Sequence, residues 1–500
     1  MKEVLDKING IVWGVPTLLL ILVAGLYLTI RSGFFQVVFL PRAFRSFLGK
    51  LKPSAKTENG VSPYQALCTA LAATVGTGNI AGVAGAIALG GPGAVFWMWV
   101  CAFLGMILKC AEATLAVKYR RVNGQGEVIG GPMHMIEQGL GNRFRWLAVL
   151  YAFFGVVAAF GVGNATQINA VLGGIHSAAN YFGVAVSFKT DMVIAAILAV
   201  MIAFMLSGGG KRIGKIAEAV VPIASVFYIL LGLGVLIVRA DMLPAAFHTI
   251  LQGAFSPEAV TGGVVGSMFF VCRVGSARGV FTNEAGMGTA SIAHAAAEVS
   301  HPVEQGLMGI MEVFLDTIVI CTITALVILC SGVPISYGQD PGAMLTTSAF
   351  SQIYGGWVSI LIALSLVCFA VATVLGWSYY GLRCAQYLFG DGIFKLFIVT
   401  QIITVILGAV LKTGTVWVMA EIVNGLMAVP NLIALMGLSL QFLKLLQEYK
   451  TGKLFAYGGT NENFNQCKSL RTFSHAEIPS HGGSSAKRGE DHLSSEYRSA

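Results

Sequence analysis

Long runs of apolar residues, separated by short polar stretches, make up most of the chain between residues 11 and 440. Eleven of these runs reach roughly 18 residues, which is long enough for an α-helix to cross the hydrocarbon core of a bilayer. The pattern therefore predicts an all-α polytopic membrane protein with about 11 transmembrane helices. Their centres fall near residues 20, 76, 105, 158, 198, 226, 268, 318, 367, 402 and 427.

The composition agrees with this prediction. The 500 residues are 56% hydrophobic and 11% charged, with a mean hydropathy of +0.76, so polar side chains are too few to cover a soluble core. The first run, residues 11–30, is too long for a signal-peptide core and lacks a small-residue cleavage site, so it should remain as a membrane helix. The nine cysteines form no CxxC pair or Cys/His cluster, and we expect no disulfide, metal cluster or cofactor.

The net charge of +8 comes from Lys and Arg that concentrate in certain connections and in the tail. Residues 31–61, 118–146 and 207–215 are basic and alternate with nearly uncharged connections, so the positive-inside rule places them in the cytoplasm. An odd number of crossings then puts the N-terminus outside and the C-terminus in the cytoplasm. No basic face is interleaved with aromatic residues, which argues against a nucleic-acid partner. Residues 446–500 are polar and typical of a disordered tail.

The second run, residues 71–87, is interrupted by the sequence GTGN at residues 76–79, where a plain spanning helix would carry Leu or Ile. A break at membrane depth frees backbone groups that need polar partners. Carbonyl groups released near residues 72–75 would suit a small cation, and amides at the start of the second half-helix would suit a carboxylate. The alternative is a stripe of small residues for close helix packing, formed by Gly78, Gly82 and Gly85.

The seventh run, residues 259–280, is interrupted by several glycines, which are Gly262, Gly263, Gly266, Gly275 and Gly279. It comes five helices after the second run and should enter the membrane from the other side. Two Gly-interrupted helices at matching positions of oppositely oriented halves indicate an inverted-repeat secondary transporter. We therefore expect an N-terminal helix and basic loop, two five-helix repeats and a tail, over residues 1–61, 62–240, 241–445 and 446–500.

Several motifs between residues 62 and 440 carry a family resemblance. The sequences GGPGAVFWMW, GGPMHMIEQGLG, RVGSARGVFTNEAGMGTASIAHAAA and NGLMAVPNLIAL resemble the alanine or glycine:cation symporters, also called sodium:alanine symporters. The resemblance implies a leucine-transporter-type fold, with ten core helices in two inverted five-helix repeats and one extra N-terminal helix. It also implies uptake of a small neutral amino acid with sodium as co-substrate. Some members prefer glutamine, so the side chain of the substrate stays open.

The resemblance also implies a sodium site. Ala72 and Val75 would contribute backbone carbonyls, while Ala370 and Thr373 would contribute a carbonyl and a hydroxyl from a second helix. A threonine hydroxyl is a good neutral ligand for a hard cation. The alternative for Thr373 is a hydroxyl bonded back to its own helix. Thr74 and Asn79 would occupy a second cation site.

A substrate site follows from the same resemblance. Thr77 and Gly78 would hold the carboxylate beside Asn79, and Gln167 would face the substrate, although it could instead join two helices by a hydrogen bond. No Asp or Glu lies in either predicted break, so carbonyls and neutral side chains would have to hold the ammonium group. Aromatic residues could wall the side chain or simply pack the helices. The remaining candidates are Gly263, Phe269, Phe270 and Trp377.

Four ionisable residues, Glu112, Glu218, Glu312 and Asp316, lie inside apolar runs, where an unpaired charge is costly. They could form a proton relay or gate, or they could be paired structurally, for example with Lys109. No HExxH or GxSxG motif supports a membrane enzyme, and two broken helices favour alternating access over a channel. Because the predicted breaks hold no titratable group, the sequence favours sodium over proton coupling. The expected setting is a bacterial inner membrane, with the lipid bilayer, sodium and a neutral amino acid as partners.

Overall fold

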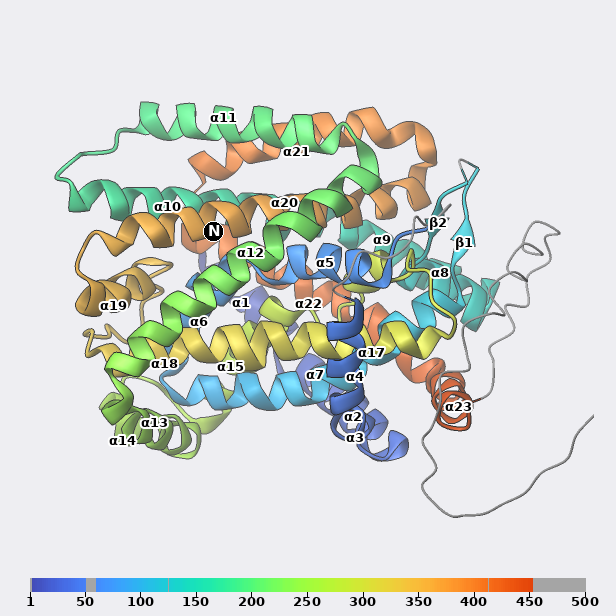
Figure 1. The fold of residues 1–500 in the computed structure, drawn as a ribbon, viewed down its shortest axis with the longest axis horizontal. Helices are drawn as coiled ribbons and strands as arrows, with labels where there is room; N and C mark the ends of the chain where they lie inside the picture. Colours follow the sequence, from blue (N-terminus) through green and yellow to red (C-terminus); the bar gives the residue numbers. More distant parts are fainter. Residues whose placement is uncertain (1, 51–59, 125, 412, 453–500) are drawn as a thin grey trace, which may run out of the picture. The chain divides into compact units, whose positions relative to one another are not determined.

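The computed structural model describes residues 2–50, 60–124, 126–411 and 413–452 (Figure 1). Most of the predicted tail, residues 453–500, lies outside these residues. The described residues are almost entirely helical, apart from one antiparallel hairpin and one isolated bridge between Val61 and Ala297. The hairpin consists of β1 (Arg121–Val122) and β2 (Val128–Ile129).

Four helices precede the first interrupted segment. Residues Glu3–Ser32 form the first candidate membrane span, which α1 and α2 share. Gly33 ends α2 in the left-handed conformation, with φ 71°, and its N–H closes the last turn on Ile30. The four helices are α1 (Lys2–Val12), α2 (Val15–Ser32), α3 (Phe35–Val38) and α4 (Leu40–Lys50).

The first predicted repeat starts at α5, whose N-cap Ser62 accepts a hydrogen bond from the N–H of Gln65 ahead of Pro63. Its helices and turns are α5 (Pro63–Thr74), η1 (Thr77–Asn79), α6 (Ala81–Gly90), α7 (Gly93–Lys118), α8 (Pro132–Met135), η2 (Ile136–Leu140), η3 (Asn142–Phe144), α9 (Arg145–Phe160), η4 (Gly161–Ala165), α10 (Thr166–Tyr181), α11 (Phe188–Leu206) and α12 (Gly209–Val238).

The second predicted repeat and the residues after it contain the remaining elements. They are η5 (Ala240–Met242), α13 (Leu243–Phe255), α14 (Pro257–Thr261), α15 (Met268–Asn283), α16 (Ala290–His294), α17 (Pro302–Val313), η6 (Phe314–Cys321), α18 (Thr322–Ser331), α19 (Met344–Tyr354), α20 (Val358–Phe389), η7 (Asp391–Ile393), α21 (Phe394–Val410), α22 (Thr413–Gly437) and α23 (Ser439–Lys450). Because α23 continues to Lys450, the first residues of the predicted tail are helical.

Ten of the eleven predicted spans correspond to long apolar helices. Among the described residues, nine helices are long and apolar enough to cross a membrane, and there are ten if the bent pair Pro63–Thr74 and Thr77–Gly90 counts as one span. The eleventh prediction, residues 259–280, is divided by a turn after α14. Its main helix, α15, has only 16 residues.

The two interrupted segments run in opposite directions. A Cβ atom on Gly90, at the end of α6, would lie 2.9 Å from Val274, and one on Gly78 would lie 3.3 Å from Thr282. The residue numbers therefore fall along one segment as they rise along the other. This is the relation expected of the first helices of two inverted repeats.

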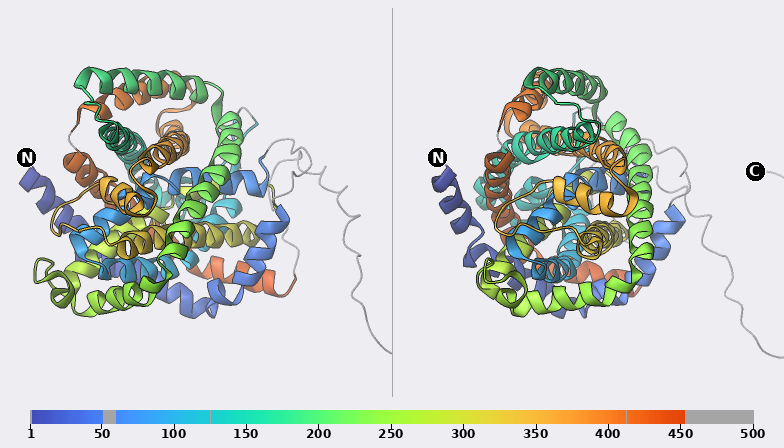
Figure 2. Two further views of the ribbon diagram at one scale, coloured as in Figure 1. Left: turned by 60° about the vertical axis from the view of Figure 1, so that its left-hand side comes forward. Right: turned by 90° about the vertical axis from the view of Figure 1, so that its left-hand side faces the viewer.

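Matching helices of the two halves also contact each other. α7 packs along α17, α11 along α21, and α9 and α10 along α20. Figure 2 shows α11 and α21 side by side at the edge of the helix assembly. Glycines allow the closest approach between α7 and α17, since a Cβ atom on Gly309 would lie 2.9 Å from the carbonyl oxygen of Lys109.

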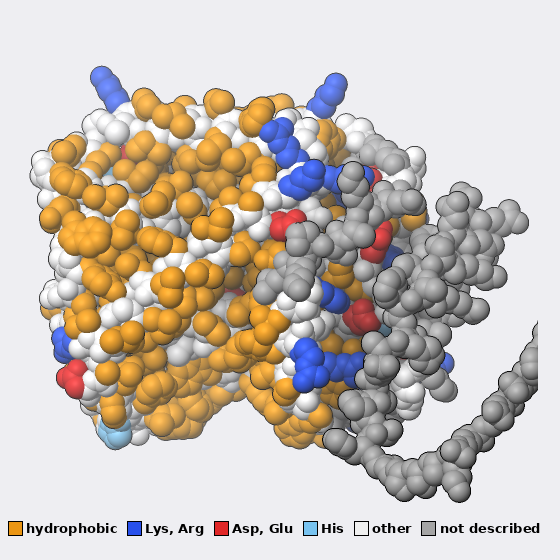
Figure 3. All heavy atoms as spheres, in the orientation of Figure 1, with side chains coloured by type: hydrophobic (Ala, Val, Ile, Leu, Met, Phe, Trp, Pro, Cys, Tyr) orange, Lys and Arg blue, Asp and Glu red, His pale blue; other side chains and the backbone are white. Residues whose placement is uncertain are grey.

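The surface is apolar over most of the face in Figure 3, as expected where helices meet lipid. Large apolar side chains that are exposed in the structure include Ile197, Val200 and Ile237. Most Lys and Arg side chains visible on this face lie toward its right-hand side, the side on which Figure 1 shows α4. The charge distribution therefore separates one end of the helices from the apolar belt.

Candidate substrate and cation site

The first break lies where the sequence predicts it. α5 ends at Thr74, the chain is extended at Gly76, and the two half-helices meet at an angle of 56°. In a continuous helix the N–H of Gly76 would bond to the carbonyl of Ala72. Here it donates instead to Oδ1 of Asn79, at 2.8 Å. The helix is therefore held open by an asparagine within the break itself.

The carbonyl groups of Ala72 and Val75 are among those that lose their helical donors at this break. The N–H of Gly76 bonds to Asn79, so it does not reach Ala72, and the N–H of Asn79 donates to Gly76 at 3.3 Å, so it does not reach Val75. Ala72 and Val75 are both buried. These are the two carbonyls that the resemblance assigns to sodium.

Thr373 on α20 faces the same break. A Cβ atom on Gly76 would collide with Oγ1 of Thr373, and Gly376, one turn later, lies against the backbone of Ala73. Thr373 is 2% exposed, and its hydroxyl has no hydrogen-bond partner among the described residues. The alternative of a bond back to its own helix is therefore not observed. A buried hydroxyl without a partner suits a ligand for a hard cation.

Ala370 is buried one turn before Thr373 on the same helix, which is continuous through this region. Thr74 behaves differently, because its hydroxyl donates to the carbonyl of Ala70 at 3.2 Å. Of the six predicted cation ligands, Ala72, Val75 and Thr373 therefore lie at the break with groups that lack a partner, while the side chain of Asn79 is engaged with Gly76 and Asp316. The Thr74 hydroxyl is already engaged within α5.

Gln167 is the predicted substrate residue that contacts the break directly. The hydroxyl of Thr77 donates to Oε1 of Gln167 at 2.8 Å, and Nε2 of Gln167 donates to the carbonyl of Val162 at 3.1 Å. The π-helical turn η4 places this carbonyl beside Gln167. Gln167 thus joins two helices, as the alternative interpretation holds, and does so at the break.

Three predicted substrate residues are not brought to the break. Gly263 is exposed in the turn after α14, with φ 82°, and no described atom lies within 4 Å of the position that a Cβ atom would take there. Phe269 is 49% exposed, and Phe270 packs against Arg273. Trp377, in contrast, is buried one turn after Thr373 and packs against Gly163 of η4. It lies beside the helix that carries Gln167.

The second break lies further along the chain than the glycine pattern predicts. α15 continues to Asn283, Glu284 adopts the left-handed conformation with φ 54°, and helix resumes at Ala290. The prediction that no Asp or Glu lies in either break is therefore wrong, because Glu284 is the first residue of this one. The missed signal is the polar sequence NEAGMGT, in which Gly286 and Gly288 both have positive φ.

This shift changes which aromatic residues face the first break. Phe281 lies in the last turn of α15, and its Cδ1 would be 3.5 Å from a Cβ atom on Gly78. Its ring contacts that of Trp417 on α22, with centroids 5.0 Å apart. Phe281, Thr282 and Trp417 therefore occupy the position that the sequence assigns to Phe269 and Phe270.

Ion pairs close the structure on both sides of the breaks. On one side, Arg278 pairs with Asp340 at 3.0 Å and with Glu421 at 3.2 Å, and it stacks on Trp417. On the other side, Arg383 pairs with Glu127 of the hairpin at 2.8 Å.

Near that second pair, burial, with a smaller contribution from the positive charges of Arg121 and Arg383, lowers the pKa of His134 to about 4. Its imidazole is therefore uncharged at neutral pH. The Arg383–Glu127 pair consequently faces no additional positive charge from His134.

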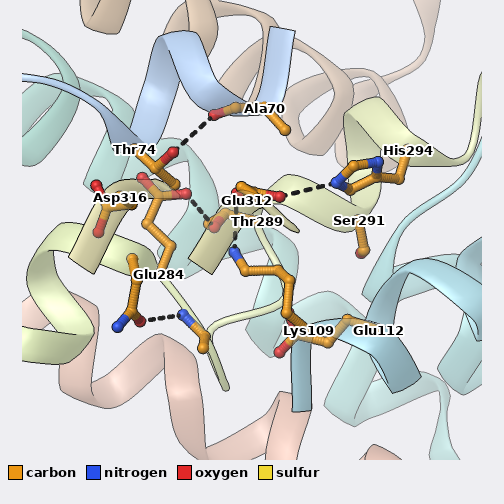
Figure 4. A network of polar contacts seen from close by, with 12 residues as sticks. Ala70, Thr74, Lys109, Glu112, Glu284, Thr289, Ser291, His294, Glu312 and Asp316 are labelled. Atoms are coloured by element: carbon orange, nitrogen blue, oxygen red, sulfur yellow. Dashed lines mark hydrogen bonds and ion pairs between the residues drawn. The ribbon is translucent and has the colours of Figure 1, made fainter. Parts of the chain in front are cut away.

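A buried polar network connects the two breaks (Figure 4). Nζ of Lys109 lies 3.2 Å from Glu312, whose other oxygen lies 2.8 Å from Nε2 of His294. Asp316 accepts a hydrogen bond from the side chain of Asn79 at 2.6 Å. Glu312 is therefore paired with Lys109, and Asp316 brings a carboxylate to the first break that the sequence leaves without one.

The remaining intramembrane acid predicted from the sequence, Glu218, is only partly buried on α12. Glu112 instead belongs to the network and binds the second break. It accepts hydrogen bonds from the N–H groups of Gly286, at 2.8 Å, and Gly288, at 3.1 Å. A carboxylate on α7 thus satisfies backbone donors that the interruption of the helix leaves free.

Two discontinuous helices of opposite direction, meeting at a buried polar centre, define the class of secondary membrane transporters built from inverted repeats. The fold is confirmed by similarity to the solved structure of MhsT in complex with L-phenylalanine, which has a TM-score of 0.55 at 14% identity and covers 79% of this chain and 99% of that one.

The chain belongs to the sodium:alanine symporter family, whose sequence profile matches residues 1–464. It is 44% identical over 443 residues to the sodium/alanine symporter AgcS of Methanococcus maripaludis, covering 87% of this chain and 94% of that protein. It is 36% identical over 463 residues to the probable sodium/glutamine symporter GlnT of Bacillus subtilis, covering 91% and 92%. The family consists of sodium-coupled amino-acid symporters, so the resemblance drawn from the motifs is confirmed.

Proposed function

We propose that this protein takes up a small neutral amino acid, alanine or glycine, together with sodium by alternating access. The observation that carries the proposal is the meeting of the unpartnered Thr373 hydroxyl with the break at Gly76. Around it, the carbonyls of Ala72 and Val75 lack their helical donors, and Ala370 lies one turn away. Neutral oxygens of this kind are the ligands that a hard monovalent cation requires.

The carboxylate of the substrate would bind the N–H groups of Thr77 and Gly78, because the first amides of a helical segment lack partners within it. Gln167, held by Thr77, would face the ammonium group together with backbone carbonyls. Phe281 and Thr282 lie against Gly78, which leaves little space for a long side chain. This crowding favours alanine or glycine over glutamine.

Alternating access is supported by the opposite directions of the two broken segments and by the contacts between matching helices. Two sets of ion pairs would have to open in turn. The pairs of Arg278 with Asp340 and Glu421 close one side, and the pair of Arg383 with Glu127 closes the other.

Uptake of radiolabelled alanine, glycine and glutamine into proteoliposomes tests the proposal, with sodium and proton gradients imposed separately. We expect an inward sodium gradient to drive accumulation of alanine or glycine. Accumulation of glutamine alone would show that glutamine, and not alanine or glycine, is the substrate. Uptake that does not depend on the sodium gradient would overturn the proposed sodium coupling.

The basic connections support a bacterial inner-membrane orientation with the N-terminus outside and the C-terminus in the cytoplasm. A reporter fused after Lys450 should then be active in the cytoplasm. A reporter inserted near Gly338, in the connection that contacts the end of α6, should be active only outside. The reverse pattern would exclude this orientation.

Replacing Gln167 with alanine should weaken substrate binding more than folding. The change removes the acceptor of the buried Thr77 hydroxyl, and such a loss costs about 1–3 kcal/mol. We expect the substrate concentration for half-maximal uptake to rise by roughly tenfold. Asn169→Ala is the matched control, because Asn169 lies on the same helix but bonds to Leu411. Equal affinities in both variants would show that Gln167 does not serve the substrate.

A further inference from the structure

The buried network around the second break contains more acidic than basic groups. Four carboxyl groups, one ammonium group and one imidazole lie there, each at most 1% exposed. If all carboxyls were ionised, at least two negative charges would remain without a counter-charge, even with a protonated imidazole. Isolated charges are strongly unfavourable in such an environment. The six residues are Lys109, Glu112, Glu284, His294, Glu312 and Asp316.

Two of the carboxyl groups have strong partners for their charged forms. Glu312 lies 3.2 Å from Lys109 and 2.8 Å from His294, one contact for each oxygen. Asp316 accepts hydrogen bonds from Asn79 at 2.6 Å and from Thr317 at 2.7 Å. Hydrogen bonds and ion pairs of this kind stabilise a carboxylate in a low-dielectric environment.

Glu112 is stabilised on one oxygen only. Its Oε1 accepts hydrogen bonds from Gly286, Gly288 and Asn431, all at 2.8–3.1 Å. Its Oε2 is fully buried and has no hydrogen-bond partner among the described residues. Glu112 binds the same loop that starts at Glu284. Its unpartnered oxygen therefore indicates that the carboxyl groups around this loop outnumber the hydrogen-bond donors and positive charges available to them.

Of the four carboxyl groups, that of Glu284 has the fewest hydrogen-bond donors and positive charges to stabilise its ionised form. Its carboxyl group accepts a hydrogen bond from the hydroxyl of Thr289, at 2.5 Å. Within the part of the chain that the structure describes, no Lys, Arg or His lies within ion-pair distance of it. It is also the first residue after α15, so any movement of the break moves its carboxyl group.

We propose that the second break is a proton-binding site in which Glu284 is the protonated carboxyl group, and that it releases this proton when residues 284–289 rearrange during transport. The inference rests on the proposed function, since it couples the proton to the transport cycle. In the release step the O–H bond of Glu284 breaks, the proton passes to a water molecule, and the carboxylate remains.

Charged and titratable groups reach this site from every element packed around it. They are Lys109 and Glu112 on α7, Tyr151 on α9, His294 on α16, Glu312 on α17, Asp316 in η6 and Tyr380 on α20. The carboxyl groups of Glu112, Glu312 and Asp316 are equally buried, but each has more hydrogen-bond donors or positive charges near it than Glu284 has.

The side of α16 offers a candidate exit for the proton. A cavity there is lined by Thr69, Ala293, Ala296, Tyr379 and Arg383. It lies beside the Arg383–Glu127 pair, whose opening would admit water. Release toward this side would therefore accompany opening of that pair.

Infrared difference spectroscopy on the purified full-length protein in lipid tests the protonation directly. Spectra taken between about pH 5 and pH 9 should contain the carbonyl band of a neutral carboxylic acid. This band should disappear in Glu284→Gln, which mimics the protonated form, and persist in Glu284→Asp. Glu258→Gln, at an exposed position on α14, is the matched control and should leave the band unchanged. An unchanged band in Glu284→Gln would overturn the assignment.

Sodium-driven alanine uptake over the same pH range supplies the second measurement. The uptake rate of the parent protein should differ by about tenfold or more across this pH range, because each pH unit changes the ratio of protonated to ionised carboxyl groups tenfold. Uptake by Glu284→Gln should be nearly independent of pH. Loss of sodium binding in Glu284→Gln at constant pH, with no carboxylic acid band in the parent, would make Glu284 a sodium ligand instead.

The two proposals fail in different ways. If the acid band is present but sodium drives no amino-acid uptake, the proposed function fails while the protonation stands. If sodium drives uptake equally at all pH values and no band is found, only the protonation of Glu284 fails.

Discussion

Gly78→Leu should abolish amino-acid uptake while leaving the protein in the membrane. A Cβ atom at Gly78 would already lie 3.3 Å from Thr282 and 3.5 Å from Phe281, so a leucine side chain must displace both or fill the space beside them. That space is where the substrate carboxylate would approach the backbone amides. We expect uptake to fall by on the order of 100-fold, since overpacking and loss of the anion site add. Uptake and surface expression are measured together.

The control for this prediction is another glycine of the same helix. A Cβ atom on Gly82 would lie 3.9 Å from Thr282, an ordinary contact, so Gly82→Ala should transport nearly as the parent does. If Gly78→Leu transports normally, the glycines of this segment serve helix packing only. If both variants fail equally, the segment as a whole is sensitive and the carboxylate assignment loses its support.

The first break is predictable from the sequence because its cause is local. Glycine and asparagine within four residues interrupt an apolar run, and the structure uses the same asparagine to bind the freed N–H of Gly76. The partner helix is also predictable, but only through the family resemblance. Nothing in the local sequence of Thr373 indicates that its hydroxyl faces Gly76, which lies in the other half of the chain.

The glycine pattern misplaces the second break because glycine content is an incomplete signal. The glycines at 262, 263 and 266 form a surface turn before α15, and those at 275 and 279 allow α15 to lie against α7. The actual break occurs at residues 284–289, where the chain is polar but contains only two glycines. Its stability comes from Glu112, which is distant in sequence, so local patterning does not identify it.

The buried charges illustrate the same limit. The sequence identifies Glu312 and Asp316 as costly groups and offers one structural partner, Lys109, near Glu112. The structure pairs Lys109 with Glu312 and uses Glu112 for the loop, which requires α7, α17 and the second break to meet. Pairing of this kind depends on tertiary contacts rather than on spacing along the chain.

Thr373→Ala should shift the sodium dependence of uptake to higher concentration. The hydroxyl would be one of several oxygen ligands, so its loss should weaken sodium binding by about 1–3 kcal/mol, or roughly 5- to 150-fold, without removing the ion. Linkage requires that the alanine affinity fall at low sodium and largely recover at saturating sodium. The measurement is alanine uptake as a function of sodium at several alanine concentrations.

Two variants separate the hydroxyl from the shape of the side chain. Thr373→Ser keeps the oxygen and should stay close to the parent, whereas Thr373→Val keeps the branched shape without the oxygen and should behave like Thr373→Ala. Valine fills the space beside Gly76 as threonine does, whereas serine lacks one branch of the side chain. If the role of Thr373 were purely steric, Thr373→Ser and not Thr373→Val would impair transport. An unchanged sodium dependence in both Thr373→Ala and Thr373→Val would exclude this hydroxyl as a sodium ligand. Asp316, whose carboxylate contacts Asn79 at the break, would then be the next ligand to test.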